Sequence, residues 1–207
     1  MDAFLVSTLA ISIAEIGDRS LLLALLLGIR YRRPWPVFWG MVLGLFANQL
    51  LSALVGLWLF SLLPPLWQPW LIAAVFLLMA VWLLFEEDDE VPPVQPGLHL
   101  LLGSALAFFL LEMADKTQVT VIALMGAYGQ LVPVVLGATL GILLVTTPAL
   151  WLGNKFADRI PSKTVHRLAS LLFLLLALWI VADALGWLPN WWSVTELFPR
   201  LSAPVRA

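Results

Sequence analysis

The 207-residue sequence contains no cysteine, only two histidines and few charged residues. The lack of cysteine excludes disulfide bonds and thiolate metal sites. Charged residues make up 12% of the chain, against about a quarter in soluble domains, so a soluble globular protein is excluded. A net charge of −2 without any basic stripe argues against nucleic-acid binding. His99 and His166 fall near the ends of apolar segments, so no buried histidine is expected. Without a buried histidine, a cysteine or a Ser–His arrangement, an enzyme is not expected.

Apolar residues make up 62% of the chain, and the mean hydropathy is +0.98. A membrane-spanning helix needs about 20 such residues. The first and fourth candidate segments are long enough to be tilted or interrupted. The chain begins with Met1 and Asp2 and has no basic region before its first apolar segment, which is therefore expected to be retained. The six candidate spans are 3–28, 37–63, 69–85, 98–125, 132–153 and 165–185.

The two halves of the sequence align without a gap at a constant offset of 97 residues. Matches between glycines, prolines, aromatic residues and acids at one offset are rarely fortuitous, so they indicate a duplication. The matched pairs are Glu15 with Glu112, Asp18 with Asp115, Tyr31 with Tyr128, Pro36 with Pro133, Gly40 with Gly137, Gly44 with Gly141, Gly56 with Gly153, Pro64 with Pro161 and Trp82 with Trp179.

The predicted fold is an all-α integral membrane protein with six transmembrane helices in two inverted three-helix repeats. Repeat 1 covers residues 1–85 and repeat 2 covers 98–186. Between them, residues 86–97 form an acidic, proline-rich linker, which either gathers cations or is simply solvated. Residues 187–207, rich in tryptophan, are expected to be an interfacial tail.

The distribution of basic loops predicts that the repeats are antiparallel in the membrane. Loop 30–36 contains three arginines, whereas its counterpart at 127–133 has no basic residue. Loop 61–69 has none, whereas its counterpart at 153–167 has four. Basic loops mark the cytoplasmic side. Both termini are therefore expected outside and the linker inside.

Each repeat carries one acidic motif in the middle of its first span, EIGDRS at 15–20 and EMADKT at 112–117. On a continuous helix the Glu and Asp of each motif would share a face, and the basic residue four positions after the Glu would lie close enough to pair with it. Gly17 and Ala114 permit either a close helix approach or a local break. The candidate ligand residues are Glu15, Asp18, Ser20, Glu112, Asp115 and Thr117, with Arg19 and Lys116 as supporting cations.

Charges at mid-membrane cost about 2.5–3.5 kcal/mol each on insertion scales, so they usually serve a function. The alternative is a set of structural ion pairs. Four carboxylates and two cations leave a charge of −2, which one divalent cation or two protons would balance. Oxygen ligands without cysteine or buried histidine suit Ca²⁺, Mn²⁺ or Mg²⁺. Sequence alone does not choose among the three metals.

The second and fifth spans carry GMVLG at 40–44 and GATLG at 137–141. Such small-residue pairs allow two helices to approach closely, either as a movable contact near the site or as ordinary packing. Asn48 and Gln49 follow on the second span. They are expected either to add ligand oxygens or to hydrogen-bond between helices.

Two copies of E-x-G-D-[KR]-[ST], one in the first helix of each repeat, resemble the cation/proton antiporter family of the Golgi and the chloroplast. The resemblance extends from Ala3 to about Leu185, includes Gln118 after the second motif, and departs from the pattern at Ala114. It implies manganese and calcium transport, with bacterial relatives acting as manganese exporters. It also implies that Glu15, Asp18, Glu112 and Asp115 form the ion path.

The leading functional hypothesis is a secondary transporter that exports Mn²⁺, or Ca²⁺, in exchange for protons by alternating access, with no permanently bound cofactor. The protein is expected in a lipid bilayer, the bacterial inner membrane. The alternatives are a passive divalent-cation channel, in which the acidic residues act as a filter, and an exporter of another small solute.

The inverted topology predicts the accessibility of single cysteines, which this cysteine-free chain allows to be introduced one at a time. Cysteines near Pro64 and Tyr128 should react with a membrane-impermeant maleimide added outside. Cysteines near Arg32 and Lys163 should react only after permeabilisation. Labelling of all four from one side would exclude antiparallel repeats.

Overall fold

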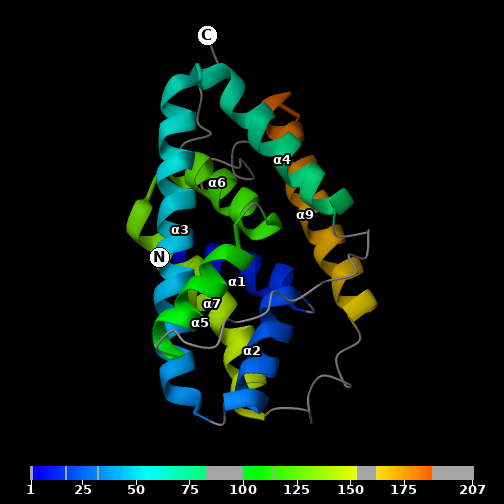
Figure 1. The fold of residues 1–207 in the computed structure, drawn as a ribbon. Helices are drawn as coiled ribbons and strands as arrows, with labels where there is room; N and C mark the ends of the chain where they lie inside the picture. Colours follow the sequence, from blue (N-terminus) through cyan, green and yellow to red (C-terminus); the bar gives the residue numbers. More distant parts are fainter. Residues whose placement is uncertain are drawn as a thin grey trace.

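The computed structural model describes residues 2–16, 18–31, 33–82, 100–113, 115–152 and 162–187, and every regular element in them is helical (Figure 1). The expectation of an all-α protein is confirmed for these residues. The helices are α1 (Asp2–Glu15), α2 (Arg19–Tyr31), α3 (Pro34–Leu62), the short 3₁₀ helix η1 (Pro65–Trp67), α4 (Gln68–Trp82), α5 (Leu100–Leu111), α6 (Lys116–Tyr128), α7 (Leu131–Leu152) and α9 (Ser162–Ala184).

In the part of the chain that the structure describes, three helices are long and apolar enough to cross a membrane: Pro34–Leu62, Pro65–Trp82 and Leu131–Trp151. They correspond to the second, third and fifth predicted spans. Shorter apolar helices cover Arg19–Gly28, Leu100–Leu111 and Ser170–Ala184. The arrangement of all six segments as inverted spans stays a prediction. The linker 86–97, the loop 153–161 and the tail beyond Trp187 lie outside the described residues.

The first and fourth predicted spans are each interrupted at the acidic motif. Glu15 ends α1 and Arg19 begins α2, while Leu111 ends α5 and Lys116 begins α6. The expected interruption is therefore confirmed. The expectation that each motif lies on one continuous helix face is wrong, because an aspartate precedes each second helix, and a carboxylate is favoured at that position.

The helices of the two repeats are interleaved. The main partner of α1 is α7, and the main partner of its counterpart α5 is α3. In the same way α2 packs against α7, and α6 against α3. Each broken helix thus packs on the second helix of the other repeat, so neither repeat forms a separate bundle.

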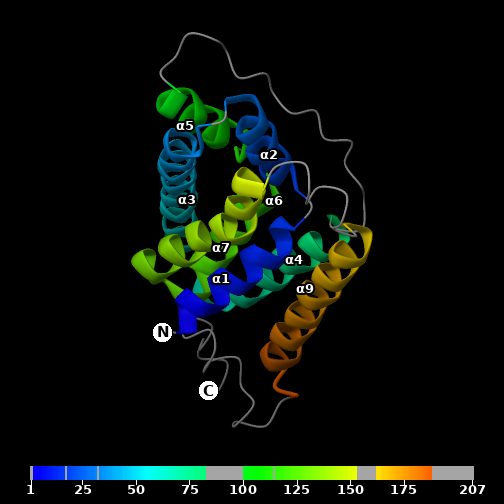
Figure 2. The same cartoon turned by 90° about the horizontal axis from the view of Figure 1, so that it is seen from below.

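The third helices of the two repeats, α4 and α9, lie side by side along one edge of the molecule (Figures 1 and 2). Phe76 and Phe173 are fully buried between them, with ring centroids 5.7 Å apart. The hydroxyl of Ser170 donates to the carbonyl oxygen of Ala80. Apolar packing and one buried hydrogen bond therefore hold the pair together.

Four glycines of α3 and α7 bring these helices into backbone contact with α5 and α1. A Cβ atom at any of these glycines would lie only 2.2–2.8 Å from a backbone oxygen of the partner helix. The contacts advance in step along both helices, so α3 runs parallel to α5 and α7 runs parallel to α1. The close contacts predicted from the small-residue pairs are thereby confirmed. They join Gly40 to Leu101, Gly44 to Ala105, Gly137 to Phe4 and Gly141 to Thr8, and the 97-residue shift converts the first two into the last two.

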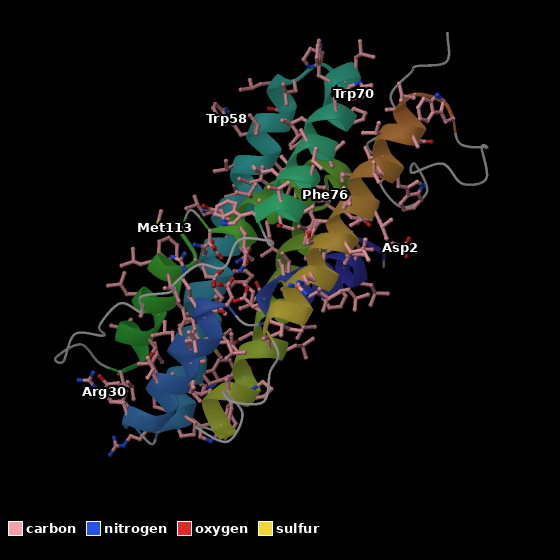
Figure 3. All side chains as sticks on the ribbon, turned by 90° about the vertical axis from the view of Figure 1, so that its right-hand side faces the viewer. Asp2, Arg30, Trp58, Trp70, Phe76 and Met113 are labelled. Carbon is pink, nitrogen blue, oxygen red and sulfur yellow. The ribbon has the colours of Figure 1, made fainter. Side chains whose placement is uncertain are left out.

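The distribution of exposed residues is the reverse of that in a soluble protein. Leu43, Trp58 and Leu175 on outward helix faces are each more than half exposed, whereas most of the polar side chains on the described helices are buried. An extended apolar exterior of this kind suits a lipid environment. In Figure 3, Arg30 and Trp70 lie at opposite ends of the molecule, and Met113, at the second break, lies between them. The second break is thus far from both ends.

Candidate functional site

The two acidic motifs have the same local structure in both repeats. Glu15 ends α1, and Glu112 lies in the turn directly after α5. Asp18 and Asp115 stand immediately before α2 and α6, and their carbonyl oxygens accept the first hydrogen bonds of those helices. The N-terminus of a helix has a partial positive charge, which favours a carboxylate there. The fold therefore presents two glutamates and two aspartates at four helix ends.

All of the predicted ligand residues are buried. Exposed fractions are 0% for Glu15, 3% for Asp18, 2% for Glu112 and 9% for Asp115. Ser20 and Thr117 are completely buried, and Lys116 is 8% exposed. Carboxylates are rarely buried to this extent unless they are paired or bind a cation. The partners of these side chains therefore show whether the carboxylates are paired within the protein.

Two contacts of the site join one repeat to the other, and a third lies within repeat 1. Lys116 Nζ lies 2.8 Å from Asp18 Oδ2. The hydroxyl of Thr117 donates to Glu15 Oε2 at 3.2 Å, and the hydroxyl of Ser20 donates to Glu15 Oε1. The expected pairing of Lys116 with Glu112 in its own motif is wrong, because the break removes the one-turn spacing and Asp18 is the partner instead.

The residues that follow each aspartate contact it through the backbone. The backbone N–H of Arg19 donates to Asp18 Oδ1 at 2.8 Å. Gln118, predicted as a supporting residue, donates its backbone N–H to the carbonyl oxygen of Asp115 at 3.1 Å. In both motifs the aspartate therefore accepts a backbone hydrogen bond from the start of the helix that it precedes.

The four carboxylates form one electrostatic cluster. All four lie at the two breaks, and Lys116 and Thr117 of the second break contact Asp18 and Glu15 of the first. With every group ionised, the cluster has a charge of −2, from four carboxylates and two cations. Among the described residues, however, no three acidic or histidine side chains are close enough together to hold a metal ion as they stand.

The hydrogen bonding of the two glutamates is not symmetric. Both carboxylate oxygens of Glu15 accept a hydroxyl, from Ser20 and from Thr117. These two hydroxyls occupy equivalent positions in the repeats, but both bind the same glutamate. Glu112 Oε2 is buried and has no hydrogen-bond partner among the described residues. One glutamate is therefore satisfied by hydroxyls, and the other has an oxygen available.

Asn48 and Gln49 lie on α3, which passes the junction of α5 and α6 about half-way along its length (Figure 1). The Asn48 side-chain nitrogen donates to the carbonyl oxygen of Phe109 at 3.0 Å. That carbonyl lies in the last turn of α5, where the break removes helical donors. Of the two alternatives predicted for Asn48, the hydrogen bond between helices is therefore confirmed. Its acceptor could not be predicted, since the only signal for a free carbonyl at Phe109 is the break itself.

Buried carboxylates and cations at helix breaks inside a duplicated bundle define an ion transporter, because charges at such positions mark ion pathways and repeat interfaces hold the binding site. Comparison with known proteins makes the assignment specific. The family described as divalent cation/proton antiporter GDT1 matches residues 3–91 and 100–187. The chain belongs to this family. It is a transporter and not an enzyme.

Three relatives show how far the similarity extends. A candidate manganese exporter of Vibrio cholerae is 34% identical over 86% of this chain and 90% of its own. A GDT1-like protein of Synechocystis is 31% identical over 93% of this chain and 98% of its own. GDT1-like protein 4 of Oryza sativa is 27% identical over 84% of this chain and 70% of its own. No solved structure matches the chain.

The ion pair between Lys116 and Asp18 makes a prediction about stability. Breaking a buried pair from one side leaves an uncompensated charge and costs about 3–5 kcal/mol. Lys116→Met and Asp18→Asn should each lower the melting temperature of the detergent-solubilised protein. The double variant should melt above the value expected from adding the two losses, because it leaves neither charge unpaired.

The matched control is Arg33→Met, which removes an exposed positive charge at the start of α3 and should change the melting temperature little. Strictly additive losses in the double variant would show that the two side chains do not stabilise each other.

Proposed function

We propose that this protein exports a divalent cation, Mn²⁺ in the first place and Ca²⁺ as the alternative, in exchange for protons. One observation carries the proposal. Four carboxylates and Lys116 are buried at the two breaks, and one oxygen of Glu112 has no hydrogen-bond partner among the described residues. A divalent cation or two protons would neutralise the cluster, so either cargo can replace the other.

The chemistry of the ligands restricts the cation. Carboxylate and hydroxyl oxygens from Glu15, Asp18, Ser20, Glu112, Asp115 and Thr117 suit hard cations. The family description adds exchange against protons, and the name of the Vibrio cholerae relative adds manganese. Together these support Mn²⁺ as cargo. The carboxylates would come together around the ion as it binds, since they are not close enough to hold it beforehand.

The duplicated architecture supports alternating access. We propose six spans in two inverted repeats, with both termini outside and the protein in the inner membrane of a bacterium. In such repeats, the conformation of one half in one state is adopted by the other half in the opposite state. The bonds of Ser20 and Thr117 to Glu15 would then belong to one state. In the other state the two hydroxyls would bond to Glu112, and Glu15 would have the available oxygens.

Removing one carboxylate from either motif tests the proposal. Glu15→Gln and Glu112→Gln preserve the size of the side chain but change the cluster charge from −2 to −1. Both variants should lose Mn²⁺ transport by about tenfold or more, equivalent to about 1.4 kcal/mol or more. Partial desolvation makes each lost charge important. Uptake of Mn²⁺ into proteoliposomes at matched protein amounts is the measurement.

The control is Glu87→Gln, which removes one negative charge from the acidic run outside both motifs and should transport normally. Near-normal Mn²⁺ transport by either motif variant would make the buried carboxylates structural ion pairs and would contradict the proposed function.

A further inference from the structure

The side-chain amide of Gln49 is buried and makes no hydrogen bond to the described residues. It is 0% exposed. Neither its side-chain oxygen nor its side-chain nitrogen has a hydrogen-bond partner among the described residues. Buried amides almost always have partners, because burial without one is costly. A leucine would fill the same space without that cost. Helix packing alone therefore does not account for an amide at this position.

The level of Gln49 along α3 is fixed by contacts on either side of it. Asn48 donates to the carbonyl oxygen of Phe109, near the end of α5. About two turns further along α3, a Cβ at Gly56 would lie 3.0 Å from the carbonyl oxygen of Ile122 in α6. The part of α3 between these contacts therefore lies level with the end of α5 and the start of α6, on either side of the second break. Gln49 lies within this part.

The side of α3 on which Gln49 lies is also fixed. Residues seven and eleven positions apart share one face of a helix. Gly56 and Phe60 stand at those spacings from Gln49, and both contact α6, Gly56 through Ile122 and Phe60 through Gly126. The buried amide is thus on the face of α3 that packs against α6, at the level of the break between α5 and α6.

The same break contains a second unpartnered group, Glu112 Oε2. A carboxylate oxygen and an amide oxygen are both ligands that Mn²⁺ and Ca²⁺ accept. The repeat partner of Gln49 is Thr146, whose hydroxyl already donates to the carbonyl oxygen of Ile142 at 2.9 Å. The unused amide therefore exists in one repeat only.

We propose that the side-chain oxygen of Gln49 is a ligand of the transported cation and binds it together with Glu112 Oε2. The assignment rests on the proposed function. A neutral ligand adds coordination without adding negative charge, so the cluster stays at −2 and can still release its ion to protons. It also makes the pathway unsymmetric, with an amide oxygen from the second helix of repeat 1 and none from the second helix of repeat 2.

The test is Gln49→Met. Methionine has nearly the same size and shape as glutamine, but its side chain has no oxygen. The melting temperature of the purified protein is measured with and without MnCl₂, and Mn²⁺ uptake is measured in proteoliposomes. A ligand role predicts an apparent Mn²⁺ affinity at least about tenfold weaker in both assays. Without metal, the variant should be as stable as the wild type or more stable, because an unpartnered amide has been removed.

Two further variants complete the design. Gln49→Glu keeps an oxygen at the same place and should bind Mn²⁺ at least as tightly as the wild type, which keeps the inference testable if Gln49→Met does not fold. Thr146→Val changes the equivalent position of repeat 2 and should leave Mn²⁺ affinity unchanged.

A purely structural glutamine gives the opposite pattern: Gln49→Met lowers the stability without metal and keeps the Mn²⁺ affinity. That result, or weak binding by Gln49→Glu, would overturn the ligand assignment alone. A wild-type protein with neither Mn²⁺ uptake nor Mn²⁺-dependent stabilisation would overturn the proposed function together with it.

Discussion

Ionisable side chains that are buried inside an apolar helical bundle need partners from within the bundle, since burial without a partner is costly. In this protein the need is met between the two motifs: Lys116 pairs with Asp18, and Thr117 donates to Glu15. Because these interactions join the two copies of the motif, the breaks must lie side by side. The interleaved packing of the repeats follows from the same requirement.

The glycines of α3 and α7 make that interleaving possible. Each second helix runs parallel to the broken helix of the other repeat at backbone contact, through Gly40 and Gly44 on one side and Gly137 and Gly141 on the other. Larger residues would force the helices apart and separate the two breaks. The glycine pairs and the charged motifs are therefore parts of one arrangement. The glycine pairs set the distance between the helices. The charged motifs contact each other at that distance.

Several features of the fold could be predicted from the sequence. The duplication, the helical class, the burial of both motifs and the close glycine contacts all follow from matches at one offset and from apolar segment lengths. The family relationship could be predicted as well, because a pair of matching acidic motifs is specific. The excess length of the first and fourth spans predicted either a tilt or an interruption, and the structure shows the interruption.

The partners of the charged residues could not be predicted. Spacing within a motif favours pairing between Glu112 and Lys116, but a broken helix abolishes that geometry and the nearest carboxylate belongs to the other repeat. The difference in hydrogen bonding between Glu15 and Glu112 could not be predicted either, since the two motifs are nearly identical in sequence. The role of Asn48 as a donor to Phe109 depends on a carbonyl that only the break leaves free.

Coupling between metal and protons is the central claim, and it is tested most directly in proteoliposomes containing the purified protein and a pH-sensitive dye. An imposed pH gradient should drive Mn²⁺ against its own concentration gradient, with protons moving in the opposite direction. Protons should also compete with the metal, so transport should weaken as the metal-loading side is acidified. A Mn²⁺ flux that only runs down its gradient, without proton counterflow and without pH dependence, would contradict exchange and identify a channel.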